Sequence, residues 1–118
     1  MEIREHWERT KHYLEPALDG SYTLDDVWTE ISEDRAQFWP LPNGAVVTQV
    51  LEFPQRRVLR IWLAGGRLDE FQFAVERATE YAIHRGCSAV EIDGRKGWQR
   101  ALAGFKQTRV VLSKEIEV

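Results

Sequence analysis

Apolar residues recur at helical spacing in three stretches of the chain. The clearest stretch is Leu68–Arg85, where apolar side chains repeat at i, i+3 and i+4. A second helix is predicted over residues 24–35, because Thr23 is a good N-cap and acidic residues follow it. A first helix is predicted over about residues 2–18, and Pro16 is expected to end or kink it. The chain therefore begins with two helices and carries a long third helix past its middle.

Other segments show the shorter period and the β-branched residues that are typical of strands. The predicted strands span residues 37–41, 45–53, 58–63, 89–92 and 108–117. Short turns join the first three, which predicts an antiparallel meander, whereas the long helix before the fourth predicts a parallel crossover. Ala64-Gly65-Gly66 is expected to break the third strand, and a loop over 94–97 and a short helix over 98–103 precede the last one. The order ααβββαβαβ predicts an α/β (α+β) fold with a mixed sheet, built as a three-layer sandwich.

Length and composition favour one ordinary globular unit. The 118 residues predict a single domain over 1–118, and thirteen aromatic residues argue against disorder. No apolar run is long enough for a membrane span, and the N-terminus lacks the apolar core of a signal peptide. One cysteine cannot form an internal disulfide, which favours a reducing, cytoplasmic location. No membrane partner is expected.

Charge is distributed unevenly along the chain. Residues 1–37 hold four basic and ten acidic groups, whereas residues 93–118 hold six basic and three acidic ones. The two ends either attract each other within the fold or offer surfaces of opposite sign to partners. Because the net charge is −3, binding to nucleic acid is not favoured overall.

Three separated motifs carry a resemblance to a known family. The segments are Trp62–Glu70 (WLAGGRLDE), Arg85-Gly86-Cys87 at the end of the long helix, and Gly94–Trp98 (GRKGW). With Leu102–Phe105 (LAGF) before the last predicted strand, they resemble small phage and prophage proteins that are regarded as GNAT-like, the fold of the acyl-CoA N-acyltransferases. The resemblance implies this fold across nearly the whole chain. For the phage group it also implies a role in particle assembly, inside the host cell or in the virion.

The family's cofactor site supplies the first candidate residues. In GNAT proteins the pyrophosphate of acyl-CoA lies on backbone N–H groups at the start of the long helix. By resemblance, Gly65, Gly66 and Arg67 would hold it if acetyl-CoA binds at all. This sequence departs from the family's motif there, and Asp69 and Glu70 place negative charge in the first turn. For that reason no cofactor is expected under the first hypothesis below.

The family's catalytic groups are also incompletely matched. Arg100 stands where many members have a tyrosine that acts as an acid, and arginine does not release its proton at working pH. It would only stabilise charge. Glu52 and Glu91, on or near the central strands, are the candidates for a base, although no spacing singles either out.

Other chemistry-bearing residues point to no defined site. The three histidines are not at ligand spacing, so no metal is expected, and Cys87 is interpreted as structural. Trp98 is interpreted as a residue at the core edge. A basic set near the C-terminus is either a solvated surface or a contact for phosphate, nucleic acid or an acidic partner. It comprises Arg95, Lys96, Arg100, Lys106 and Arg109.

Three hypotheses of function follow. The first is a catalytically degenerate GNAT-like protein that acts through contacts with a protein partner, such as a phage structural protein. The second is an active acyl-CoA-dependent N-acetyltransferase with a shortened pyrophosphate loop. The third is an accessory protein that contacts nucleic acid through its basic C-terminal segment.

Overall fold

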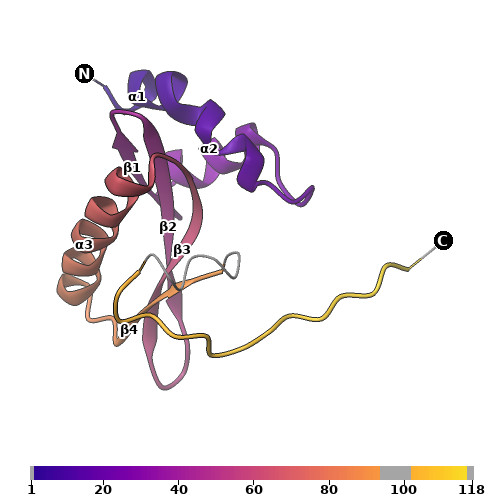
Figure 1. The fold of residues 1–118 in the computed structure, drawn as a ribbon, viewed down its shortest axis with the longest axis vertical. Helices are drawn as coiled ribbons and strands as arrows, with labels where there is room; N and C mark the ends of the chain where they lie inside the picture. Colours follow the sequence, from indigo (N-terminus) through magenta and orange to yellow (C-terminus); the bar gives the residue numbers. More distant parts are fainter. Residues whose placement is uncertain (1, 94–101, 117–118) are drawn as a thin grey trace.

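The structure is a computed structural model that describes residues 2–93 and 102–116. It contains a four-stranded mixed sheet with helices on both faces (Figure 1). The strands are β1 (Gln37–Leu41), β2 (Gly44–Glu52), β3 (Arg57–Gly66) and β4 (Ala89–Ile92), and they lie in this order across the sheet. The helices are α1 (Ile3–Thr10), α2 (Leu24–Ser32) and α3 (Leu68–His84), with 3-10 turns η1 (Lys11–Tyr13) and η2 (Glu15–Ala17) after α1.

Strand pairing confirms the predicted meander and crossover. β1 pairs with β2 and β2 with β3, both antiparallel, because turns of a few residues join them. β3 and β4 are parallel, with the 17-residue helix α3 between them in sequence. The mixed sheet and the α/β (α+β) class are therefore confirmed.

Two hydrophobic layers hold the sheet between its helices, which confirms the three-layer sandwich. On one face, Trp7 of α1 and Val27 of α2 pack against Val47 of β2. On the other face, Phe71 and Val75 of α3 pack on the opposite side of the strands (Figure 1). Neighbouring residues of β2 point to opposite faces, so the continuous burial of Gly44–Thr48 fits a strand that is covered on both sides.

The first two helices are shorter than predicted. α1 ends at Thr10, and the predicted helix over 2–18 continues only as two 3-10 turns, with Pro16 in the first turn of η2. α2 ends at Ser32 rather than at 35. There, Asp34 adopts a left-handed φ of 62°, and the backbone N–H groups of Arg35 and Ala36 both donate to the carbonyl of Glu30.

The prediction that Ala64-Gly65-Gly66 breaks the third strand is wrong. β3 continues through Gly66, because Ala64, Gly65 and Gly66 pair with Val46, Ala45 and Gly44 of β2. Glycine is unfavourable inside a strand, but pairing with β2 stabilises the extended backbone of these residues.

The predicted last strand is also wrong over the residues that can be compared. Residues 108–116 form no strand, although their sequence alternates as a strand does, because no strand pairs with them among residues 2–93 and 102–116. The predicted loop over 94–97 and most of the predicted helix over 98–103 lie outside the described residues.

Candidate functional site

β4 covers only part of the length of β3. β3 pairs with β4 from Val58 to Ile61, which is the whole of β4, and β3 then runs on to Gly66. A β-bulge between β2 and β3 lies directly after the last of these pairs, since Val47 pairs with Leu63 whereas Thr48 pairs with Ile61. Among the described residues, no strand pairs with the β4-facing edge of β3 beyond Ile61. Extended backbone with unpaired N–H and C=O groups is suited to binding a ligand that contains amides.

The end of this open stretch leads directly into α3. Arg67 is the N-cap of α3, and its backbone N–H donates to the carbonyl of Asn43 in the β1–β2 turn. A small cavity of about 140 Å³ lies at this junction, and its lining is mostly apolar. It is lined by Ala64, Gly65, Gly66, Leu68 and Phe71. The three consecutive residues predicted for a cofactor, Gly65, Gly66 and Arg67, therefore lie at this junction, and the two glycines line its cavity.

Close packing explains both glycines. A Cβ on Gly65 would overlap the carbonyl of Tyr13, which lies in η1 on the α1 side of the sheet. Gly66 has a φ of 112°, and a Cβ there would overlap the carbonyl of Asn43. The fold itself therefore requires glycine at both positions, whether or not a ligand approaches.

The chain's own side chains neutralise charge at the start of α3. The Arg67 guanidinium donates to both carboxylate oxygens of Asp69, at 3.2 and 3.1 Å. This contact first, and the backbone N–H groups of residues 69 and 70 as well, hold the pKa of Asp69 below its ordinary value. The same contact raises the pKa of Arg67. A pyrophosphate would be attracted by the Arg67 guanidinium and by the N–H groups at the helix N-terminus. The guanidinium and some of these N–H groups already contact the Asp69 carboxylate.

The second acidic residue of this turn is fixed in place by a residue that the sequence analysis missed. Asn43 donates its backbone N–H and its side-chain Nδ2 to the Glu70 carboxylate, at 2.7 and 2.9 Å. The sequence pattern places Asn43 only in a turn between strands. What identifies Asn43 is its contact with a carboxylate 27 residues away in the sequence, and this contact forms only when the chain folds.

The structure places Glu52 far from this junction. Glu52 ends β2 and forms an ion pair with Arg57, 2.6 Å away, at the opposite end of β3 from Gly66. Nine residue steps at about 3.3 Å put roughly 30 Å between the two ends of β3. Glu52 therefore does not share a site with Gly65 and Gly66.

Glu91 lies one residue before the end of β4. It pairs in register with Arg60, one position before the last pair, and its side chain is 17% exposed. Its carboxylate accepts from Arg56 at 3.4 Å and from Arg109 at 3.3 Å. The candidate bases are thus on separate parts of the sheet, and Glu91 is already held by two guanidinium groups.

The remaining candidates add no further chemistry among the described residues. Arg95, Lys96, Trp98 and Arg100 lie outside them. Cys87 is a half-buried free thiol. Within residues 2–93 and 102–116 there is no cluster of three or more His, Cys, Asp or Glu side chains suited to a metal ion. In the same part of the chain, none of the helices has both the length and the apolar character needed to cross a membrane.

Comparison with solved structures identifies the fold. A Thermus thermophilus protein aligns with a TM-score of 0.69 at 16% identity, covering 99% of this chain and 95% of the other. A glucosamine-6-phosphate N-acetyltransferase from Arabidopsis thaliana aligns at 0.68 with 15% identity, over 99% of this chain and 95% of that one. A GNAT family acetyltransferase from Staphylococcus aureus aligns at 0.65 with 10% identity, over 98% of this chain and 95% of that one. The chain has a GNAT-like fold.

Sequence comparisons add no closer relation. No protein-family model matches the chain. No curated protein matches it either. The GNAT-like fold therefore rests on the arrangement of strands and helices, as the predicted element order implies.

Proposed function

We propose that this GNAT-like protein does not bind acyl-CoA in the manner its fold suggests, and that it acts through contacts with protein partners. One observation carries the proposal. At the start of α3, where a pyrophosphate would lie, the Asp69 carboxylate already accepts hydrogen bonds from Arg67. The Glu70 carboxylate beside it accepts a hydrogen bond from Asn43. An incoming pyrophosphate would have to displace or face two carboxylates, which disfavours its binding.

The separation of the candidate bases supports the same proposal. General base catalysis requires a group within hydrogen-bond reach of the reacting amine. Glu52 lies at the far end of β3, and the Glu91 carboxylate is engaged by Arg56 and Arg109. Among the described residues, neither candidate base is therefore both close to the expected cofactor site and free to accept a proton.

The class of partner follows from the sequence resemblance. The three motifs shared with small phage and prophage proteins favour a phage structural protein as the partner, with a place in the host cytoplasm or in the virion. The large apolar side chains that stay exposed near the C-terminus, Leu112 and Ile116 among them, are suited to protein contact.

A second candidate function, an N-acetyltransferase, is favoured by a different observation. β4 ends opposite Ile61 while β3 continues, so that among the described residues one edge of β3 has no partner strand there, and a cavity of about 140 Å³ lies at the end of this stretch. Two proteins that share this fold are named as acetyltransferases. Under this proposal acetyl-CoA would be the cofactor, with Gly65, Gly66 and Arg67 beside it.

Calorimetric titration of acetyl-CoA into the full chain separates the two candidates. Our proposal predicts no saturable binding up to about 1 mM cofactor. Two matched variants test the junction, Leu68→Glu and Leu68→Gln. Leu68 lines the cavity and is 54% exposed, so either change is compatible with folding, and the two side chains differ in charge but hardly in size.

Saturable micromolar binding by the unmodified protein would overturn the proposal. If Leu68→Glu then weakened that binding at least about tenfold while Leu68→Gln preserved it, the cofactor would lie at the start of α3. Release of free thiol from acetyl-CoA in the presence of an amine would establish the acetyltransferase instead.

A further inference from the structure

The sheet face that packs against α1 and α2 is polar over the half nearer the β2–β3 hairpin. Figure 1 shows both helices at the end of the sheet away from this hairpin. The hydrophobic cluster under them includes Val47 of β2 but no residue of β3 before Trp62. Gln49 faces the same side as Val47, because side chains alternate along a strand. Arg60 and Glu91 lie beside Gln49 in register, so these three residues form a polar row across β2, β3 and β4.

Arginines outnumber carboxylates around Glu91. Arg56 and Arg109 both contact its Oε2 atom, at 3.4 and 3.3 Å, and Arg109 also contacts Oε1 at 3.5 Å. Arg60 is the register partner of Glu91 on β3. Its Nη2 donates to Gln49, but its buried Nε has no acceptor among the described residues. Three guanidinium groups thus surround a single carboxylate, which leaves an excess of positive charge on this part of the sheet.

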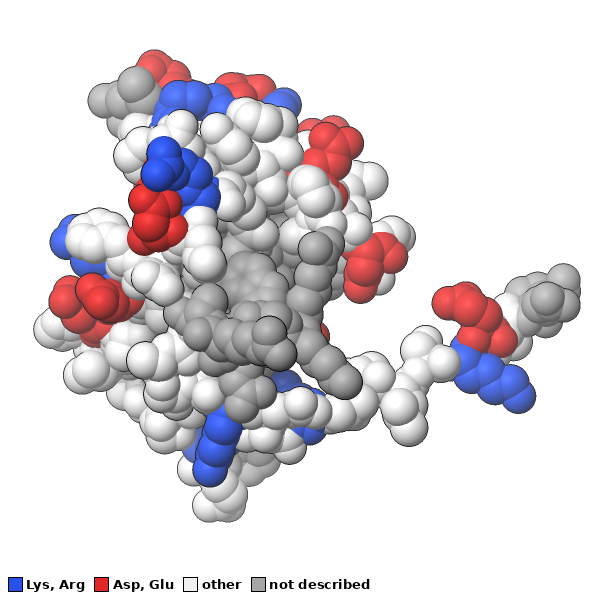
Figure 2. Space-filling model, viewed as in Figure 1, with Lys and Arg blue, Asp and Glu red and all other residues white. Residues whose placement is uncertain are grey.

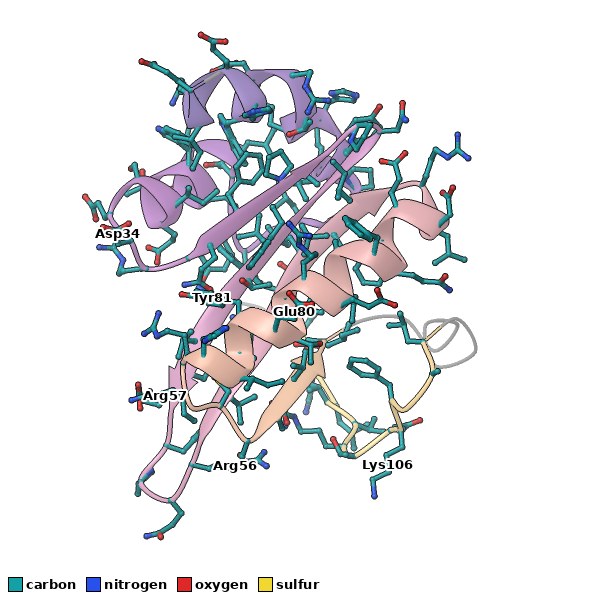
Figure 3. All side chains as sticks on the ribbon, turned by 90° about the vertical axis from the view of Figure 1, so that its left-hand side faces the viewer. Asp34, Arg56, Arg57, Glu80, Tyr81 and Lys106 are labelled. Carbon is teal, nitrogen blue, oxygen red and sulfur yellow. The ribbon has the colours of Figure 1, made fainter. Side chains whose placement is uncertain are left out.

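These guanidinium groups also have many unused donors. Each carries five N–H donors, and the contacts within the described residues use one of Arg56, one of Arg60 and two of Arg109. The side chains of Arg56 and Arg109 are 49% and 62% exposed, so their other donors are accessible. Both line one groove of about 1250 Å³, and so does Lys106. Figure 3 shows Arg56 and Lys106 below α3, with β4 between them in this view.

The remaining charges do not cancel this excess. Glu76 and Asp93 also line the groove, but among the described residues no ion pair joins either of them to an arginine there. Figure 2 shows Lys and Arg, and hardly any Asp or Glu, at the lower end of the body, where Figure 1 places the β2–β3 hairpin. The surface is therefore suited to an anion.

The origin of the three arginines indicates the kind of anion. Arg56 comes from the hairpin, Arg60 from β3 and Arg109 from the C-terminal segment, so their donors approach from different directions. A carboxylate has one charge and two oxygens, and one guanidinium is enough to satisfy it. A phosphate group carries nearly two charges near pH 7 and offers three oxygens or more. Phosphate matches these arginines better.

We propose that Arg56, Arg60 and Arg109 form a binding site for a phosphate group, either free or as the monoester of a small molecule. The phosphate accepts from the donors that Glu91 does not use, while Glu91 keeps Arg56 and Arg109 close together before the phosphate binds. Residues 65–67 and Leu68 do not line this groove, so the site is separate from the start of α3. It does not depend on whether acyl-CoA binds.

Titration of inorganic phosphate into the full chain, followed by NMR of the arginine Nε–H groups, tests the site. At about pH 7.5 and constant ionic strength, the signals of Arg56, Arg60 and Arg109 should shift saturably, with a Kd of about 1 mM or lower. Acetate should bind at least about tenfold more weakly, because it carries a single charge. Shifts that do not saturate by about 20 mM phosphate, or equal binding of acetate, would overturn the proposal.

Two matched charge deletions test which arginines take part. Arg109→Gln lies in a segment without helix or strand, and we expect it to weaken phosphate binding at least about tenfold. Arg77→Gln removes the same charge from the exposed side of α3, where Arg77 lies over the Phe73 ring, and should change binding less than about twofold. Circular dichroism should be unchanged in both. Equal losses would mean that binding follows net charge alone, and the site would be wrong.

A third variant should act in the opposite direction. Glu91→Gln keeps an oxygen acceptor of nearly the same size but removes the negative charge beside the phosphate, so binding should tighten by about threefold or more. Unchanged or weaker binding would contradict the placement of the phosphate next to Glu91.

Comparison with a simple monoester, glycerol phosphate, distinguishes the two sources of phosphate. Equal affinity or weaker binding of the ester would support free phosphate, and binding at least about tenfold tighter would support the phosphate of a larger molecule. Leu68→Glu, at the start of α3, should leave phosphate binding unchanged, and a loss there would place the phosphate at α3 instead of on the arginines.

Discussion

At the scale of single residues, the junction between β3 and α3 shows how one sequence motif fits two explanations. Glycines before a helix are typical of phosphate-binding loops, and the same glycines are required wherever two backbones approach closely. Here Gly65 lies against the Tyr13 carbonyl and Gly66 against the Asn43 carbonyl. Arg67 and Asp69 then satisfy each other. Packing thus explains the glycines, and their cofactor role stays a prediction.

A substitution at Gly65 measures this packing directly. Gly65→Ala should destabilise the protein by roughly 2 kcal/mol or more, because the added methyl group overlaps backbone that cannot rotate away. Thermal unfolding measures the effect. The control is Gly20→Ala, where the space is open and only the positive φ of 92° opposes a side chain, at a cost of about 1 kcal/mol. If the Gly65 variant unfolds at the same temperature as the unmodified protein, the contact with Tyr13 does not constrain the fold.

At the scale of elements, local signals located the helices and strands, and hydrogen bonds set their ends. α2 begins at the predicted position, because Thr23 accepts from the Asp26 N–H while Asp26 accepts from the Thr23 N–H. β3 ends later than predicted, because β2 offers a partner for each residue from Leu63 to Gly66. The alternating pattern of residues 108–116, by contrast, produces no strand where none of the described strands lies beside it.

The capping box of α2 gives a prediction at this scale. Thr23→Ala should lower the free energy of unfolding by about 1 kcal/mol, because the N–H of Asp26 loses its acceptor. Thr29→Ala, the same change inside α2, removes only a bond from its side chain to the Asp25 carbonyl and should cost less than about 0.5 kcal/mol. Denaturant titrations of both variants would compare them. Equal losses would mean that the cap does not determine where α2 begins.

At the scale of the whole molecule, charge is balanced locally rather than between the two ends of the chain. Within the acidic first third, Glu8 pairs with Arg4 and Lys11, and Glu30 pairs with Arg35. Arg109, near the basic end, pairs with Glu91 of β4. Among the described residues, no ion pair joins the acidic N-terminal third to the basic C-terminal segment. Within the described residues, the two ends therefore do not neutralise each other.

Acid titration should reveal these local pairs. Hydrogen bonds, mainly to basic side chains and for Asp19 to Ser21, lower the pKa of four carboxyl groups, which are Glu8, Asp19, Glu30 and Asp69. A carboxyl with a lowered folded-state pKa stabilises the fold above its unfolded pKa, and this contribution disappears as the pH falls through the folded value. The melting temperature should therefore be steady near pH 6 and fall below about pH 4.

The control for this prediction is a chain in which these four residues are changed to their amides. Its melting temperature should be lower near pH 6 and should fall less between pH 5 and pH 3. High salt should reduce the difference, since Glu8, Asp19 and Asp69 are exposed, Glu30 is half-buried, and salt screens charges that solvent reaches. A melting temperature that rises as the solution becomes acidic would contradict the prediction.

The sequence by itself determined the type of each element up to β4, the order of these elements and the three-layer arrangement. It could do so because hydrophobic period, caps and turn lengths act over a few residues and are read from neighbours in the chain. Only the tertiary structure decided that Gly65 lies against Tyr13, that Asn43 holds Glu70, and that Glu52 is remote from both. Among the described residues, it also places no strand beside residues 108–116. Each of these depends on which distant backbone comes close, and that is fixed only when the layers pack together.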